Sequence, residues 1–350
     1  MACSLKISGL ASVVEKVYKF MGKKAGQSNW QYQAKSPKLI ASSLKVSGLA
    51  SCVSGLLMMM ACGQAGEAPA TAEEMLYQSS DFTAENLFTS GIEGPAVDQS
   101  GHLYAVNFEK EGTIGIINAG GETQLFAQLP EGSTGNGIRI GADGALFIAD
   151  YTGHNVLQLD PESGDISVLA HEPRMNQPND LAIRSDGVLF ASDPNWKEST
   201  GQIWRINLDG STHLLDSNMG TTNGIDLSPD EKTLYVNESV QRKVWAYELA
   251  VDGSLSNKRL LIEFPDFGMD GMRCDAQGNL FITRYGKGVV AVVSPSGELL
   301  QEVPMKGKKT SNIAFGGPDG RTCFVTLQDR GCIESFRAEF PGRSWKMLHK

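Results

Sequence analysis

Six polar residues recur along the chain at nearly even intervals, and each carries a side-chain oxygen. They are Glu93, Asn136, Asn179, Asn223, Asp270 and Asn312. Carboxylate and carboxamide oxygens are the ligands that hard cations prefer, and calcium takes six to eight of them. If the six residues meet, they would hold one divalent ion, with calcium favoured and magnesium, manganese or zinc as alternatives. Zinc usually binds His or Cys, and the set contains neither.

A repeat of 43 to 46 residues positions these side chains. Each unit has a turn followed by a short apolar strand, as in GADGALFIAD from Gly141 and RSDGVLFASD from Arg184. An apolar residue of this strand marks each of the six units, at Leu103, Leu146, Leu189, Leu234, Leu280 and Cys323. A period in the forties built from turns and strands is typical of β-propeller blades. The sequence therefore predicts an all-β fold, a six-bladed β-propeller over residues 81–345.

The last unit lacks a clear fourth strand, and the segment FTAENLF at 82–88 precedes the first unit without strands of its own. We expect residues 82–88 to complete the last blade and close the ring, which removes free sheet edges. The six oxygen-bearing residues lie ten or eleven positions before the markers, where the innermost strand of each blade begins. Their side chains should then point at one axis. Asn-Gly and Asp-Gly are also common turn sequences, which explains one such pair but not six residues in register.

At these residues the chain resembles the gluconolactonase and senescence-marker-protein family of six-bladed propellers. The resemblance covers residues 82 to about 340, with segments such as EGPAVD at 93–98 and MDGMRCDAQGNLFIT at 269–283. It implies metal ligation by Glu93, Asn179, Asn223 and Asp270. It also implies that the metal polarises a scissile carbonyl while Asp270 acts as the catalytic base.

Loops that follow the second strand of each blade should rim the mouth of the same site, because that strand runs back toward it. From these loops, and from the ring formed by the six oxygen-bearing residues, we select seven candidate substrate-binding residues. They are Asn136, Gln177, Asp193, Trp196, Glu238, Arg284 and Asn312. Members of the family commonly have Arg at the position of Gln177, where it can hold a sugar acid. The chain departs from the family there, which puts a sugar-lactone substrate in doubt.

The function we expect is that of a metal-dependent hydrolase that opens a lactone or a small ester. Two alternatives stay open. One is a phosphotriesterase-like hydrolase that uses the same ring. The other is a non-catalytic propeller of the cell envelope that binds a ligand or a protein, since propellers are common scaffolds for interaction.

The N-terminal region differs in charge from the rest of the chain. Residues 1–61 hold eight lysines and one acid, so the remainder is strongly acidic within a net charge of −9, which argues against a nucleic-acid partner. Residues 46–61 are uncharged and precede Cys62, as in a lipoprotein signal. We expect a leader over 1–61, a lipid anchor at Cys62, a polar linker over 62–80, and export to the periplasm or envelope as a monomer. A plain signal peptide and an extension of a soluble protein are the alternatives.

Overall fold

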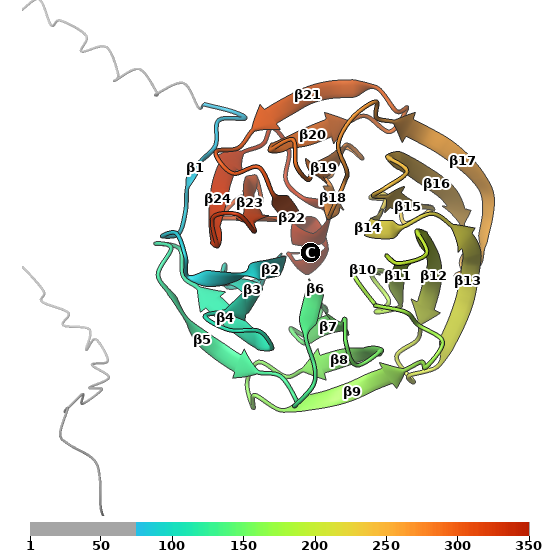
Figure 1. The fold of residues 1–350 in the computed structure, drawn as a ribbon, viewed down its shortest axis with the longest axis horizontal. Helices are drawn as coiled ribbons and strands as arrows, with labels where there is room; N and C mark the ends of the chain where they lie inside the picture. Colours follow the sequence, from blue (N-terminus) through green and yellow to red (C-terminus); the bar gives the residue numbers. More distant parts are fainter. Residues whose placement is uncertain (1–74, 350) are drawn as a thin grey trace, which may run out of the picture. The chain divides into compact units, whose positions relative to one another are not determined.

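The computed structural model describes residues 75–349. The predictions for the leader and for the anchor at Cys62 lie outside the described residues. In the described part, 24 strands form six antiparallel sheets of four strands each around a central axis (Figure 1). The predicted six-bladed β-propeller is therefore confirmed. Within residues 75–349, no helix is long and apolar enough to cross a membrane.

The blades follow one another along the chain, and the first strand of each is the innermost. Blade 1 comprises β2 (Phe88–Val97), β3 (Leu103–Phe108), β4 (Thr113–Ile117) and β5 (Thr123–Gln128). Blade 2 comprises β6 (Gly135–Ile140), β7 (Leu146–Asp150), β8 (Asn155–Leu159) and β9 (Ile166–His171). Blade 3 comprises β10 (Leu181–Ile183), β11 (Leu189–Asn195), β12 (Thr200–Ile206) and β13 (Thr212–Met219). Blade 4 comprises β14 (Thr222–Leu227), β15 (Thr233–Glu238), β16 (Lys243–Leu249) and β17 (Leu255–Glu263). Blade 5 comprises β18 (Met272–Cys274), β19 (Leu280–Arg284), β20 (Val289–Val293) and β21 (Leu299–Pro304). Blade 6 comprises β22 (Thr310–Gly316), β23 (Thr322–Leu327), β24 (Cys332–Arg337) and, from the other end of the chain, β1 (Ser80–Asp81).

The hydrophobic core lies between neighbouring sheets rather than at the axis. Every residue of β3 and β7 is buried, because both faces of a blade pack against the next blade. One such layer joins Val106 of blade 1 to Ile138 and Ile148 of blade 2. Strands buried on both faces need apolar side chains at odd and even positions alike, which explains the continuous apolar runs of the sequence repeat.

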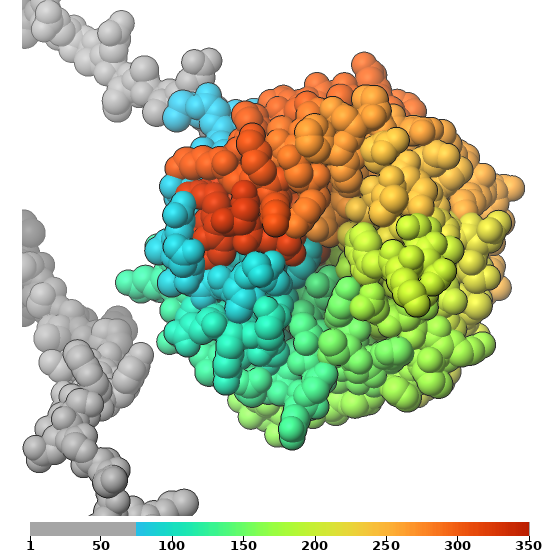
Figure 2. Space-filling view, in the orientation of Figure 1, coloured from blue at the N-terminus to red at the C-terminus, as the bar shows by residue number. Residues whose placement is uncertain are grey.

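The ring closes through an N-terminal strand in the last blade, as predicted, but the strand lies earlier than expected. Ser80 and Asp81 form β1 and pair with Ser335 and Glu334 of β24. In Figure 2 the N-terminal segment lies beside the red last blade. Residues 82–88, which we expected to be the strand, mostly form the turn into blade 1. Their backbone still bonds blade 6, since the N–H groups of Leu87 and Phe88 donate to Gly331 O. The chain leaves the strand direction where Asn86 takes a positive φ of 61°.

A C-terminal helix that the sequence analysis did not predict closes one end of the channel. Helix α2 (Arg343–Leu348) lies at the centre of the ring in Figure 1. The side chain of Arg343 is buried and donates to Ile183 O at 2.8 Å and Ser228 O at 3.2 Å. Ile183 is the last residue of β10, and Ser228 follows the last residue of β14. Both lie at the end of the channel opposite the six ring residues. The channel is therefore open at the ring and closed at the opposite face.

Candidate active site

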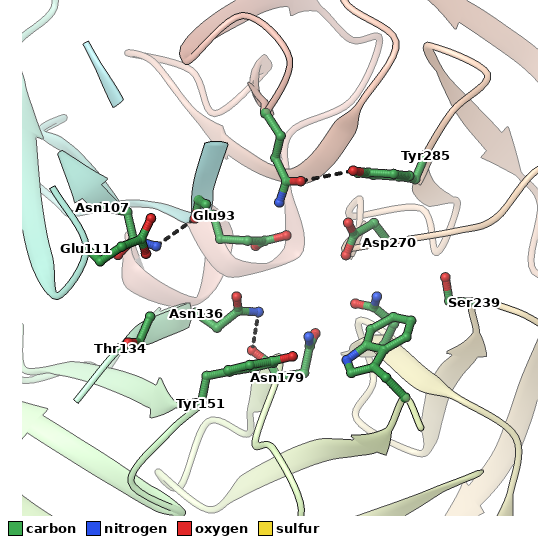
Figure 3. A pocket seen from close by; sticks show the side chains of 14 residues that line it. Glu93, Asn107, Glu111, Thr134, Asn136, Tyr151, Asn179, Ser239, Asp270 and Tyr285 are labelled. Carbon is green, nitrogen blue, oxygen red and sulfur yellow. Dashed lines mark hydrogen bonds between the residues drawn. The ribbon is translucent and has the colours of Figure 1, made fainter. Parts of the chain in front are cut away.

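The structure brings the predicted ring residues together at the floor of one cavity. Glu93, Asn136, Asn223 and Asn312 lie on inner strands. Asn179 and Asp270 lie two residues before the first residues of the inner strands β10 and β18. In Figure 3 the side chains of Glu93 and Asp270 face each other across the axis, with Asn136 and Asn179 beside them. The shared register of the six blades produces this convergence.

The glycines that follow several ring residues allow adjacent inner strands to approach closely. Gly137 N–H donates to Asn179 O at 2.8 Å, and Gly224 N–H donates to Asp270 O at 3.1 Å. A Cβ at Gly137 would lie 2.4 Å from Asp180 Oδ1, and one at Gly224 would lie 2.5 Å from Asp270 O. Neither contact leaves room for a side chain. The Asn-Gly pairs therefore reflect the crowding of strands at the axis and not a turn.

Two carboxyl groups are buried together in the ring. Burial is the largest effect on Glu93, followed by the negative charge of Asp180, and together they raise the pKa of Glu93 to about 7. Burial and then the charge of Glu93 raise the pKa of Asp270 well above its ordinary value. Glu93 Oε2 accepts hydrogen bonds of 2.8 Å from Gly94 N–H and from Asn312 Nδ2. Asn312 thus orients Glu93, while the two acids repel each other when both are charged.

Two amide oxygens of the ring have no hydrogen-bond partner. Among residues 75–349, Asn179 Oδ1 and Asn223 Oδ1 are buried and unpaired. A buried polar atom without a partner is costly unless something outside the chain satisfies it. Two carboxylates that repel and two unpaired oxygens form a donor set that fits a hard cation. Within the described residues, no three His, Cys, Asp or Glu side chains form a metal cluster, so an ion here would depend on the amide oxygens.

A second charged layer lies beneath the ring, and its acid is paired with arginines. Asp180 is fully buried between two arginines, with Arg139 Nη1 at 3.2 Å from Oδ1 and Arg273 Nη1 at 2.8 Å from Oδ2. Burial alone would raise the pKa of Asp180, but the charges of Arg139 and Arg273 outweigh it, so the pKa lies below its ordinary value. This layer separates the ring from helix α2.

The cavity above the ring has a volume of about 450 Å³. Five of the six ring residues line its floor. The sixth, Asn312, does not line the cavity and donates a hydrogen bond to Glu93. The residues that line it are Gly91, Glu93, Asn107, Glu111, Thr134, Asn136, Tyr151, Asn179, Trp196, Asn223, Ser239, Asp270, Tyr285 and Gln328. A cavity of this size is in the ordinary range for small-molecule sites.

The seven predicted substrate-binding residues fall into three groups. Asn136 and Trp196 line the cavity. Gln177 and Asn312 do not line the cavity but contact residues that do. Burial raises the pKa of Tyr151, and hydrogen bonds from Trp196 and Gln177 oppose that rise. Gln177 therefore bonds Tyr151, which lines the cavity. Asn312 contacts Glu93, as described above.

The structure places Asp193, Glu238 and Arg284 away from the cavity, contrary to our expectation. Asp193 accepts hydrogen bonds from the N–H groups of Asn176 and Gln177 at 2.8 and 2.6 Å. Glu238 accepts one from Gly220 N–H at 2.7 Å. Arg284 is fully buried, pairs with Asp266 at 2.9 Å, and lies 3.7 Å above the Phe264 ring.

These three residues share one position, four residues after the marker of each unit, with Asn107 and Asp150. A side chain there bonds the loop that leads into the inner strand of its own blade. Asp150, for example, accepts a hydrogen bond from Thr134 N–H at 3.1 Å. The position ties two segments of a blade together and has a structural role in each of the three blades where we expected a substrate contact.

Four wall residues outside the predicted substrate-binding set stand one position further along, and the rim loops had placed two of them, Tyr151 and Tyr285, at the mouth. Tyr151, Ser239, Tyr285 and Gln328 each come five residues after a marker, and all four line the cavity. Side chains alternate between the two faces of a strand, so a shift of one residue exchanges a structural contact for a cavity contact. Asn107, Glu111 and Thr134 were also not selected. The register of the repeat could have identified the four that follow the markers.

The fold and this ring define a class, the six-bladed propellers with an acid-and-amide site at the axis. The model of the SMP-30/Gluconolactonase/LRE-like region matches residues 90–329, and the chain belongs to that family.

Three similar proteins illustrate the family. A gluconolactonase of Zymomonas mobilis is 34% identical over 135 residues, which cover 35% of this chain and 37% of that protein. A 6-deoxy-6-sulfogluconolactonase of Pseudomonas putida is 27% identical over 158 residues, which cover 41% of this chain and 54% of that protein. The chain thus spans about half or less of the length of these relatives. The crystal structure of a calcium-binding protein, regucalcin, from Agrobacterium tumefaciens has a TM-score of 0.64 at 23% identity and covers 74% of this chain and 96% of that one.

Proposed function

We propose that this protein is a divalent-metal-dependent hydrolase that opens a lactone or a small ester, with calcium as the preferred ion. The observation that carries the proposal is the ring itself. Asn179 Oδ1 and Asn223 Oδ1 are buried without a partner, next to two carboxyls that repel each other. A cation bound by Glu93, Asn179, Asn223 and Asp270 would satisfy all four. Relatives named gluconolactonase and sulfogluconolactonase support a lactone as the substrate class.

When bound, the ion would supply Lewis-acid polarisation of the substrate carbonyl. The chain contributes the remaining steps. Asp270 accepts a proton from the attacking water as its oxygen adds to the carbonyl carbon, and it returns this proton to the leaving alkoxide oxygen when the C–O bond of the lactone breaks. Glu93 is held by Gly94 N–H and Asn312, so it cannot turn away from the axis. The fixed positions of these groups keep substrate and water in reacting geometry.

A turnover screen tests the proposal. The full-length protein is assayed with uncharged lactones, aryl esters and phosphotriesters, in calcium and in excess chelator. We expect lactone or ester hydrolysis that chelator abolishes and calcium restores. Phosphotriester turnover without lactone turnover would favour the phosphotriesterase-like alternative. No turnover of any class would overturn the proposal in favour of a non-catalytic propeller.

Calcium titration by calorimetry provides a second reading that does not depend on turnover. The parent should bind one ion, and Glu93→Ala should bind it more weakly, because the variant removes a charged ligand. Glu122→Ala serves as the control, since Glu122 lies in the β4–β5 turn at the opposite face. If Glu93→Ala binds calcium as the parent does, the ring is not the metal site.

A further inference from the structure

The mouth of the cavity has an acidic side, formed by blade 1. Glu111 lines the cavity from the β3–β4 loop. Thr89 Oγ1 donates to Glu111 Oε1 at 2.5 Å, and a Cβ at Gly91 would lie only 3.0 Å from both carboxylate oxygens. The carboxylate therefore rests on bare backbone of β2, two residues before Glu93. Alternate residues of a strand are ~7 Å apart. The Glu111 carboxylate, which lies over Gly91, is therefore separated from Glu93 by about one such step.

The opposite side of the mouth is aromatic and apolar, formed by blades 3 to 5. Trp196, Val240 and Phe267 lie on loops at this face with 38%, 50% and 50% of their surface exposed. Trp196 lines the cavity, and Val240 follows the lining residue Ser239. Phe267 Cδ1 lies 3.3 Å from the position of a Cβ at Gly286, next to the lining residue Tyr285. In Figure 3, Glu111 lies to one side of Glu93 and Asp270, while Ser239 and Tyr285 lie to the other.

Positive charge is held away from the cavity. Among the described residues that line it, three are acids and none is Lys or Arg. Arg284 is engaged by Asp266, and Lys287 pairs with Glu302 at 2.7 Å. Lys110 and Lys197 are on the same face and both are exposed, and charges in open solvent are largely screened at physiological salt. A negative substituent that enters the cavity would therefore meet the carboxylate of Glu111 and no lysine or arginine of the lining. A divalent ion at the floor would already be balanced by the charges of Glu93 and Asp270.

We infer that the cavity selects an uncharged lactone or ester with an apolar substituent, and that Glu111 and Trp196 determine this specificity. The inference rests on the proposed function and names its substrate class. The substituent lies along Trp196, Val240 and Phe267, where its burial removes apolar surface of both partners from water. Glu111 rejects substrates that bear a carboxylate, sulfonate or phosphate. Hydrolysis itself adds water across the ring C–O bond and releases a hydroxy acid with its proton.

Three γ-lactones test the inference: one with a ring carboxylate, its neutral methyl amide, and one with a hexyl chain. For the parent we expect kcat/KM to be highest for the hexyl lactone, lower for the amide and lowest for the carboxylate. Glu111→Gln should raise kcat/KM for the carboxylate relative to the amide about threefold, as expected for one unit charge at ~7 Å from an exposed carboxylate. Trp196→Ala should lower the ratio of kcat/KM for the hexyl lactone to kcat/KM for the amide on the order of tenfold.

Two matched controls remove the same chemistry from the opposite face. Glu122→Gln removes one negative charge, and Val251→Ala truncates an exposed apolar residue in the β16–β17 turn. Neither should change the ratios. If the parent hydrolyses lactones but Glu111→Gln leaves the carboxylate-to-amide ratio unchanged, the role of Glu111 is wrong while the proposed function stands. If the parent hydrolyses no lactone at all in calcium, the proposed function fails, and this inference fails with it. Unchanged calcium affinity in both cavity variants shows that the ring is intact.

Discussion

Two buried acidic sites lie one above the other in the same channel and differ in almost every other respect. Asp180 has two arginines within 3.2 Å, and its pKa is lowered. Glu93 and Asp270 have each other, two amide oxygens without partners, and raised pKa values. The lower site is complete within the chain, and the upper site is not. Burial of charge alone therefore does not mark a site that is open to a ligand. Two repelling carboxyls next to two oxygens without partners form a donor set that a cation would complete.

The largest expected effect is on catalysis at the incomplete site. Asp270→Asn keeps an oxygen donor of similar size but removes the charge and the base. Hydrolysis should fall about 10²- to 10⁴-fold, the usual contribution of a general base. Circular dichroism should show an unchanged fold, because the substitution also removes the repulsion with Glu93. Turnover equal to that of the parent would mean that Asp270 is not the base.

The next effect is on stability at the complete site. Asp180→Asn removes the carboxylate that pairs with both Arg139 and Arg273, and Asp226 remains as a counter-charge to Arg139 without an ion-pair contact. The loss should lower the free energy of unfolding by about 3–5 kcal/mol. Urea denaturation of the metal-free protein measures it. A loss of less than 1 kcal/mol would show that the layer is not a balanced ionic site.

The two sites should also respond to pH in opposite ways. The folded metal-free protein holds more protons at Glu93 than the unfolded chain does between pH 4.5 and about 7, so this acid makes the protein less stable as pH rises through that window. Asp180 contributes stability at pH above 3.8, which is lost as pH falls below that value, because its folded pKa is lowered. A bound cation replaces the protons of the ring. The increase in Tm on adding calcium should therefore be larger at pH 8 than at pH 5, and an equal increase at both would contradict the ring as the binding site.

The smallest effect is expected at an exposed ion pair of blade 3. Asp186 pairs with Arg184 at 2.6 Å, and the Asp186 side chain is 52% exposed. Asp186→Asn should cost about 0–1 kcal/mol, because solvent screens the pair. Measured beside Asp180→Asn by the same denaturation, it separates the effect of burial from the effect of losing one carboxylate. Equal losses in the two variants would remove the distinction between them.

The sequence was sufficient to predict the ring because one residue per unit recurs at one register. The same criterion failed four residues after the markers, where Asp193, Glu238 and Arg284 also recur but bond backbone of their own blades. Polar recurrence predicts that side chains share an environment, and it does not say whether backbone or ligand satisfies them. That distinction depends on which face of the strand a residue takes, and a shift of one residue reverses it.

The ends of the propeller were less predictable than its repeats. Strand β1 is only two residues long, too short for a pattern of alternation to mark it, and its place depends on where the turn after it begins. Helix α2 has no counterpart in the repeat. It is held by buried tertiary contacts such as those of Arg343 with Ile183 O and Ser228 O, which involve residues more than 100 positions away.

Helix α2 affects how substrate enters the site and how product leaves it. A propeller channel can open at both faces, but helix α2 closes this one at the face opposite the ring. A molecule that enters at the ring must therefore leave through the same opening. For a hydrolase, product and fresh substrate then compete for a single passage. A hydroxy acid that has just lost its proton would leave along a path that ends beside Glu111, and the repulsion that keeps acids out would also hasten their departure.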